Sequence, residues 1–498
     1  MKENYLEALK WYGKAADMGN AEAKYKIGKI LWEEGKRYLQ EIWEQGKIAA
    51  SELIKEKQIG ISYEDCIVFC STELFSISAD KRWKGIIEYS LDKINWYNWD
   101  GEEIKSYIIY MRGYGNTEIT GAFYHEGWRF ETKDKLICRG NIEALLNYKL
   151  CANGEHPPMS DRCYRGMFKG CTSLVEAPAL PATKLAKGCY NSMFEGCTSL
   201  KDTPVLPATE LADSCYYSMF KGCTSLVEAP ALPATELADS CYIGMFSGCT
   251  SLSAPPALPA EKLAEDCYAA MFKGCTSLTE APALPATKLV YGCYWAMFQG
   301  CTSLEEAPAL PATELANSCY KLMFSGCTSL VEAPALPATE LADSCYIGMF
   351  SGCTSLSEAP ALPAKELAKN CYYEMFKGCI SLEKAPALPA TKLAYGCYMN
   401  MFKGCTSLGE APALPATRLA EWCYYSMFED CTSLVEAPAL PATELADSCY
   451  IGMFSGCTSL VEAPALPAKE LAWGCYSGMF KGCTSLKDRS NLPKSCFE

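Results

Sequence analysis

The stretch Cys215-Tyr-Tyr-Ser-Met-Phe-Lys-Gly-Cys-Thr-Ser-Leu-Val-Glu-Ala-Pro-Ala-Leu-Pro-Ala-Thr-Glu-Leu-Ala-Asp-Ser240 decides the fold, because it recurs with small changes from residue 163 onward. Thirteen copies begin at residues 163, 189, 215, 241, 267, 293, 319, 345, 371, 397, 423, 449 and 475, and the last is shorter. A fixed period of 26 residues predicts a solenoid, in which each copy buries its apolar side against its neighbours.

Each copy begins with a segment that has the apolar spacing of one helix face. The residues at this spacing are Cys215, Tyr216, Met219, Phe220 and Cys223. Ser214 is a good N-cap residue and Gly222 suits the position after a helix. We therefore expect a short helix of about two turns in every copy, with these side chains pointing inward.

The second half of each copy is extended and contains two prolines. Pro230 and Pro233 lack the N–H that a central strand needs. The sequence therefore predicts very short parallel bridges between copies, mostly before the first proline, and a polyproline-like return after it. Together with the helix, this predicts an α/β solenoid of thirteen repeats over residues 163–498.

Three other segments precede the array. Residues 1–57 have the spacing of an α-helical hairpin, and residues 58–140 contain short strands that predict a small antiparallel β domain. Residues 141–162, with Asn141 as a helix N-cap, are expected to close the open end of the solenoid. Trp83, Trp96, Trp99 and Trp128 cluster in the β segment, where core packing is favoured over glycan binding.

Two family resemblances follow from these residues. Cys-Tyr-x-x-Met-Phe-x-Gly-Cys-Thr-Ser-Leu-x-x-Ala-Pro-x-Leu-Pro-Ala-Thr-x-Leu-Ala over residues 163–498 resembles the BspA-type leucine-rich repeat of bacterial surface proteins. Trp11, Tyr12, Ala15, Ala16, Gly19, Asn20, Ala21, Ala23 and Gly28 resemble a Sel1-like repeat. Both resemblances imply binding of partners and no catalytic residues.

Composition narrows the classes of partner. The net charge is −14 and no basic run stands out, which argues against nucleic acid as a partner. We expect no transmembrane segment. The first residues do not resemble a secretory signal, which fits a cytoplasmic protein, whereas the BspA-type resemblance implies the cell surface or secretion.

The sequence contains no motif for a known reaction. It has two histidines, His125 and His156, both outside the array, and no phosphate-binding or nucleophile motif. We expect no cofactor, no metal site and no enzyme activity. Two cysteines per copy account for 26 of the 31 cysteines, and we favour reduced, buried thiols over disulfides or metal ligands.

Candidate binding residues are the positions that vary while the repeat stays constant. The third residue of a copy, expected to face outward, supplies Arg165, Tyr217, Trp295, Lys321, Tyr373, Met399 and Tyr425. The pair before the first cysteine supplies Tyr291, Tyr395, Trp422 and Trp473. Tyr291 and Trp295 would form one aromatic patch on a helix. Exposed aromatic residues suit contact with a partner, and neutral drift is the competing explanation.

The sequence therefore predicts a non-enzymatic interaction or adhesion protein that binds a protein or glycan partner along an elongated surface. An intracellular scaffold or effector built from Sel1-like and leucine-rich repeats is the alternative. A third hypothesis is an enzyme with its site in residues 59–150, for which a pocket with converging ionisable groups would be needed.

Overall fold

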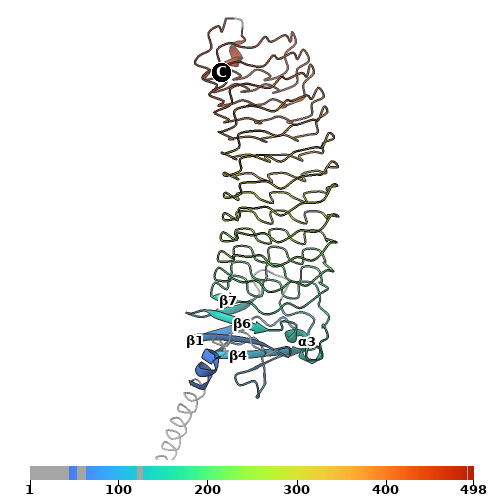
Figure 1. Cartoon of the computed structure of the whole chain (residues 1–498), viewed down its shortest axis with the longest axis vertical. Helices are drawn as coiled ribbons and strands as arrows, with labels where there is room; N and C mark the ends of the chain where they lie inside the picture. Colours follow the sequence, from blue (N-terminus) through green and yellow to red (C-terminus); the bar gives the residue numbers. More distant parts are fainter. Residues whose placement is uncertain (1–43, 53–62, 121–126, 491) are drawn as a thin grey trace, which may run out of the picture.

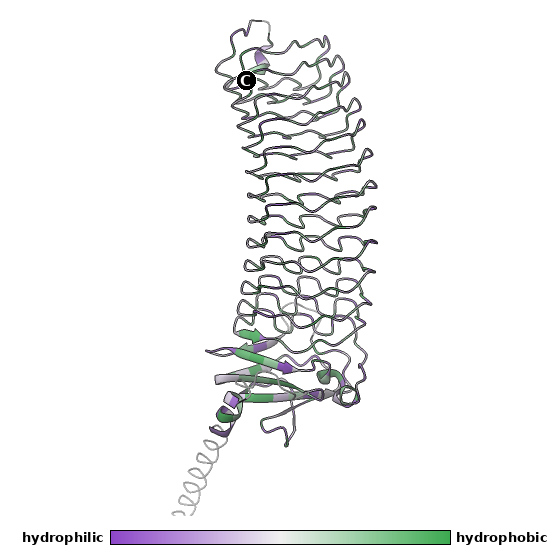
Figure 2. Cartoon of the chain, viewed as in Figure 1, coloured by the Kyte–Doolittle hydropathy of each residue, from purple (hydrophilic) through white to green (hydrophobic). Residues whose placement is uncertain are grey.

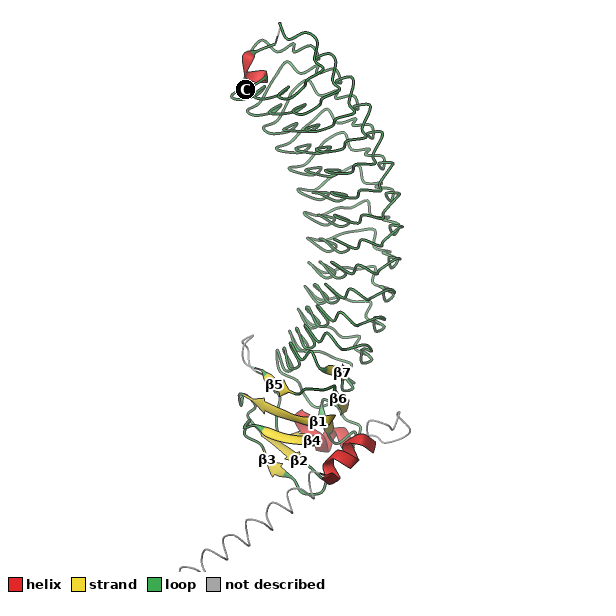
Figure 3. Ribbon diagram, turned by 90° about the vertical axis from the view of Figure 1, so that its left-hand side faces the viewer, coloured by secondary structure: helices red, strands yellow, loops and turns green. Residues whose placement is uncertain are grey.

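The computed structural model describes residues 44–52, 63–120, 127–490 and 492–498. A small sheet lies at one end of a long stack of coils, each made by one 26-residue copy (Figure 1). The stack bends along an arc (Figure 3). Of the helical hairpin predicted over 1–57, only a helix over 44–52 lies within the described residues.

The sheet has seven strands, of which six precede the array. They are β1 (Ile67–Ala79), β2 (Ile86–Ser90), β3 (Tyr97–Asn98), β4 (Ile104–Tyr114), β5 (Trp128–Glu131), β6 (Leu136–Gly140) and β7 (Leu174–Glu176). The order is β3-β2-β4-β1-β6-β7, and β5 pairs with β1. All of these pairs are antiparallel except that of β6 with β7, which is parallel. Strand β7 belongs to the first copy.

Three tryptophans form the aromatic core of the sheet. Trp83, Trp99 and Trp128 are at most 6% exposed. The ring of Trp99 lies 5.1 Å from that of Trp83 and 4.9 Å from that of Trp128. The core packing expected of these residues is therefore confirmed. Trp96 is half-buried, and the guanidinium of Arg112 lies 3.9 Å from its ring.

The sheet continues directly into the first coil. The Leu136 N–H donates to the Ser173 carbonyl at 2.9 Å, and the ring of Phe168 stacks on Phe130 at 5.3 Å. One hydrophobic core joins the buried sheet residues to those of every copy. Figure 2 shows hydrophobic residues on the strands next to the first coils. The sheet therefore gives the first coil both a hydrogen-bonded neighbour and an aromatic one.

The helix expected at Asn141 begins later in the structure. Helix α3 spans Ala144–Ala152, and its N-cap is Glu143. Asn141 accepts a hydrogen bond from the Glu143 N–H at 2.9 Å. The side chain of Asn141 thus stabilises a turn that leads into α3, because it binds a backbone N–H only two residues ahead.

The two-turn helix predicted in each copy is wrong. Residues 215–222 form a chain of turns in which every second N–H bonds within the copy and the others bond to the next copy. Tyr217 donates to Ser214 and Met219 to Tyr216, whereas Tyr216 donates to Cys241 and Ser218 to Ile243. A helix would use all these N–H groups internally. The turns leave half of them free to join neighbouring coils.

The turn chain requires a left-handed backbone at every fourth residue. Ser214, Ser218 and Gly222 have φ of 57°, 51° and 73°. Glycine adopts this conformation without strain, and asparagine, aspartate and serine adopt it at lower cost than bulky residues. Ser214 and Gly222 therefore serve the turns, and they are not helix caps.

The side chains predicted to point inward are buried. Cys215, Met219, Phe220 and Cys223 have no exposed surface, and Tyr216 is 2% exposed. Equivalent rings of successive copies stack in two continuous columns. Tyr216 lies 5.8 Å from Tyr242 with 3° between the ring planes, and Phe220 lies 5.8 Å from Phe246.

The prediction of short parallel bridges is confirmed, with a second position added. Single bridges join the residues before the first Ala-Pro, such as Glu306 and Glu332, and also residues after the second proline, such as Lys288 and Glu314. The prolines lie between these two positions, where no ladder N–H is needed. At the far end, the carbonyls of Ser495 and Cys496, next to the 3₁₀ helix η1 (Lys494–Cys496), accept from the last copy.

The left-handed positions predict opposite effects for two substitutions. Gly300 has φ of 74°, and a Cβ there would lie 3.8 Å from Gly274, so the space is sufficient. Gly300→Ala should therefore lower the free energy of unfolding by about 1–2 kcal/mol through backbone strain alone. Asp430, with φ of 62°, occupies the equivalent position, and Asp430→Gly should raise stability. Urea denaturation followed by tyrosine and tryptophan fluorescence measures both, and equal effects of the two variants would contradict this account.

Candidate functional site

The surface of the array divides into constant and variable positions. The constant residues are buried in columns, whereas the third residue of most copies is at least partly exposed and differs between copies. All eleven candidate binding residues are exposed or half-buried. Tyr291, Trp295, Tyr395 and Trp473 are 51%, 43%, 45% and 74% exposed. The half-buried ones are Arg165, Tyr217, Lys321, Tyr373, Met399, Trp422 and Tyr425.

Some of these residues lie together and others do not. The Lys321 ammonium lies 5.7 Å from the Trp295 ring of the preceding copy. The rings of Trp422 and Tyr425 lie 5.1 Å apart. Among the described residues no ring contact joins Tyr291 and Trp295, and the helix on which their shared patch was expected is not formed. The chain of turns does not place residues four apart on one helix face.

The third residues of seven consecutive copies form one column, which we call the third-residue column. It consists of Trp295, Lys321, Ile347, Tyr373, Met399, Tyr425 and Ile451. Ile347 and Ile451 were not among the predicted binding residues, although both are large, partly exposed and in register with the others. Comparing one position through all copies would have identified them. The column presents aromatic, aliphatic and basic side chains side by side.

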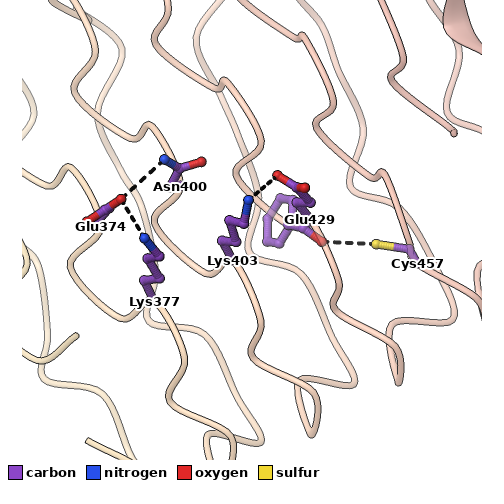
Figure 4. Close-up of polar contacts among 7 residues, drawn as sticks. Glu374, Lys377, Asn400, Lys403, Glu429 and Cys457 are labelled. Atoms are coloured by element: carbon purple, nitrogen blue, oxygen red, sulfur yellow. Dashed lines mark hydrogen bonds and ion pairs between the residues drawn. The ribbon is translucent and has the colours of Figure 1, made fainter. Parts of the chain in front are cut away.

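Polar contacts surround the middle of the third-residue column (Figure 4). The Lys377 ammonium bonds Glu374 at 2.8 Å, and the Asn400 amide donates to Glu374 at 3.5 Å. Burial and the nearby Glu374 carboxylate raise the pKa of Tyr373. Lys403 bonds Glu429 at 2.8 Å. The Asn400–Glu374 and Lys403–Glu429 contacts join neighbouring copies, whereas Lys377–Glu374 lies within one copy.

The cysteines have a structural role that the sequence did not indicate. From the second copy onward, the second thiol of the copy donates to the carbonyl of the phenylalanine in the preceding copy; Cys301, for example, lies 3.0 Å from Phe272 O (Figure 4 shows Cys457). All 31 cysteines are free and buried. Burial raises the pKa of the Cys215 and Cys301 thiols to about 12. Protonated thiols fit this role, because only the protonated form is a donor.

The raised pKa predicts slow thiol chemistry in the folded protein. At pH 8 the thiols should react with a disulfide reagent such as Ellman's reagent at least about a hundredfold slower than in denaturant, because the thiolate is the reactive form. In denaturant without reductant, nearly all 31 should titrate. Prior treatment with reductant is the control: a clear increase in the count after reduction would reveal disulfides and contradict the free thiols.

A buried carboxylate lies between the cap and the first copies. The Glu143 side chain is 1% exposed, and its Oε2 lies 2.7 Å from His156 Nδ1. Its other oxygen, Oε1, is buried without a hydrogen-bond partner. The two residues line a pocket of about 390 Å³ with Pro157, Met159 and Leu185. Burial raises the pKa of Glu143, and the hydrogen bond with His156 opposes this change.

Glu143 should make stability depend on pH. Because its pKa is higher in the folded than in the unfolded chain, its protonation stabilises the fold below the ordinary glutamate pKa. This stability is lost as pH rises through the raised value. In Glu143→Gln, the free energy of unfolding should therefore decrease less with rising pH than it does in the parent protein. Urea titrations from pH 4 to 8, followed by tryptophan fluorescence, measure this, with Glu155→Gln at an exposed site as control. An unchanged slope in Glu143→Gln would contradict the assignment.

The described residues offer little that points to a reaction. They contain no group of three or more His, Cys, Asp or Glu side chains placed to hold a metal ion. His125 lies outside the described residues. In the segment proposed for an enzyme site, a pocket of about 440 Å³ is lined by Trp83, Trp99 and several charged residues. The pKa of Glu103 there is lowered by a hydrogen bond from Lys105.

The helices of the chain and its similarity to known proteins also bear on its function. Within the described ranges, none of the helices combines the length and the apolar character needed to span a bilayer. Comparison with protein families, with curated proteins and with solved structures finds no match.

Proposed function

We propose that the chain is a leucine-rich solenoid of the BspA-type class, and that it works as a non-enzymatic interaction or adhesion protein. It binds a protein or glycan partner along the outer surface of the array. One observation carries this proposal: the inward positions are the same in nearly every copy, while the third-residue column is at least partly exposed and varied.

The composition of the column supports binding. Trp295, Tyr373 and Tyr425 are aromatic residues of the kind that dominate binding energy in protein interfaces. Their backbone is fixed on both sides by bonds to neighbouring copies. A rigid backbone lowers the entropy lost on binding. Aromatic rings on a rigid surface also suit stacking against sugars.

The repeat register provides matched deletion variants. Removing residues 371–474 deletes four copies with Tyr373, Met399 and Tyr425, whereas removing 189–292 deletes four copies and keeps Trp295 and all later members of the column. Both variants should fold, because each copy contacts mainly its neighbours. Circular dichroism and sedimentation check this.

We expect only the 371–474 deletion to lose binding, by at least about tenfold, on arrays of glycans and of extracellular proteins. The full chain is the reference on the same arrays. Equal binding by the two folded deletion variants would contradict the proposal. So would failure of the full chain to bind any array component.

A further inference from the structure

The extended half of each copy builds a second surface, opposite in character to the third-residue column. Within it, side chains alternate: Leu310 and Ala312 are buried, and Ala309, Pro311 and Thr313 are exposed. The same alternation recurs from copy to copy. The exposed alanines and prolines thus form two apolar columns along the stack, which we call the Ala-Pro face.

The Ala-Pro face is hollowed at two places. A groove of about 400 Å³ lies between two copies and is lined by Ala413, Pro415, Ala439 and Pro441. A larger one, of about 1020 Å³, lies beside the sheet and includes Val205, whose side chain is 78% exposed. The face is therefore hollowed locally, at these two places.

Two charged columns border this face, and they differ. On the side after the second proline, charges are paired between copies. Lys288 binds Glu314 at 2.9 Å, and Lys184 binds Glu210 at 2.9 Å. This border carries both signs of charge, so its net charge is small.

The other border is acidic. It consists of Glu280, Glu306, Glu332, Glu358, Glu410, Glu436 and Glu462, which we call the acidic column, and Lys384 interrupts it between Glu358 and Glu410. All seven are exposed, and parallel bridges place Glu306, Glu332 and Glu358 directly beside one another. Like charges directly opposite on neighbouring strands are unfavourable. Within the described part of the chain, no ion pair includes a member of this column.

We infer that the Ala-Pro face binds an extended, basic polypeptide segment, whose cationic side chains lie along the acidic column. This inference rests on the proposed function and assigns it a second surface and a partner chemistry. Charge complementarity identifies the partner as basic: Glu280, Glu306, Glu332 and Glu358 form an unbroken run of carboxylates, and among the described residues Lys384 is the one cation in register with the acidic column. The apolar groove favours a segment that also carries small apolar residues.

The spacing favours an extended partner with regularly placed cations. Bridged strands lie about 4.8 Å apart, so every second carboxylate is about 9.6 Å further along. A polyproline II chain advances roughly 9.3 Å in three residues. Lysine at every third position of such a chain would therefore meet alternate members of the acidic column, with the intervening residues on the Ala-Pro face.

The test uses a fluorescent 18-residue peptide, (Lys-Ala-Pro)₆, and the full chain. Fluorescence anisotropy should show binding that weakens with added salt, as expected for exposed charges. The triple variant Glu306→Gln, Glu332→Gln, Glu358→Gln should bind at least about tenfold more weakly. The matched variant Glu236→Gln, Glu314→Gln, Glu340→Gln changes net charge equally on the other border and should bind nearly as the parent does.

Two further peptides separate charge from apolar contact. (Glu-Ala-Pro)₆ should not bind, and (Lys-Gly-Ser)₆, with equal charge, should bind at least about fivefold more weakly than (Lys-Ala-Pro)₆. Equal losses in the two triple variants would reduce the effect to net charge and overturn the inference. Equal binding of the two lysine peptides, or no binding, would also overturn it.

The proposed function is tested separately. If the peptide experiments fail while deletion of 371–474 still abolishes binding on the arrays, this inference alone is wrong. If the arrays show no dependence on the third-residue column while the peptide experiments succeed, the interaction surface is the Ala-Pro face and the assignment to the third-residue column is wrong.

Discussion

The whole array depends on an alternation of backbone hydrogen bonds. In each copy one N–H closes a turn three residues back, and the next reaches a carbonyl of the following copy. Five such bonds leave the segment 214–222, from residues 214, 216, 218, 220 and 222. At a net value of about 0.5–1.5 kcal/mol each, they stabilise one interface by roughly 2.5–7.5 kcal/mol. The backbone therefore supplies stacking energy that a helix would keep within itself.

This alternation also fixes the side chains. A turn chain with a left-handed residue at every fourth position points the same side chains inward in each copy. The tyrosine and phenylalanine rings of one copy therefore stack on the same residues of the next copy. The phenylalanine column begins in the sheet, where Phe130 stacks on Phe168 of the first copy, and ends with Phe480 near Phe497. Constant residues are thus required for stacking, and only positions that face solvent are free to differ. The third-residue column follows from this division.

The sequence predicted the buried residues correctly and their backbone wrongly, for one reason. Cys215, Tyr216, Met219 and Phe220 have a spacing that fits a 3.6-residue helix and also a four-residue turn unit over so short a segment. The residues that distinguish the two are Ser214, Ser218 and Gly222, whose fourfold spacing marks left-handed positions. The prolines, by contrast, lack a backbone N–H in any conformation and so interrupt any strand, which is why the short bridges could be predicted. The candidate surface was found in part, because the varied positions are visible in the sequence, whereas the Ala-Pro face is made of constant residues.

The direction of the bonds between coils has a mechanical consequence. They run along the stack, so tension applied between its two ends pulls each interface in the direction in which its bonds break. The interfaces are joined in series and carry the same force, and the weakest one opens first. Each released copy adds 26 residues of chain, or roughly 90 Å when extended. A stack of this kind lengthens in steps under load, and the number of copies sets how far it can extend.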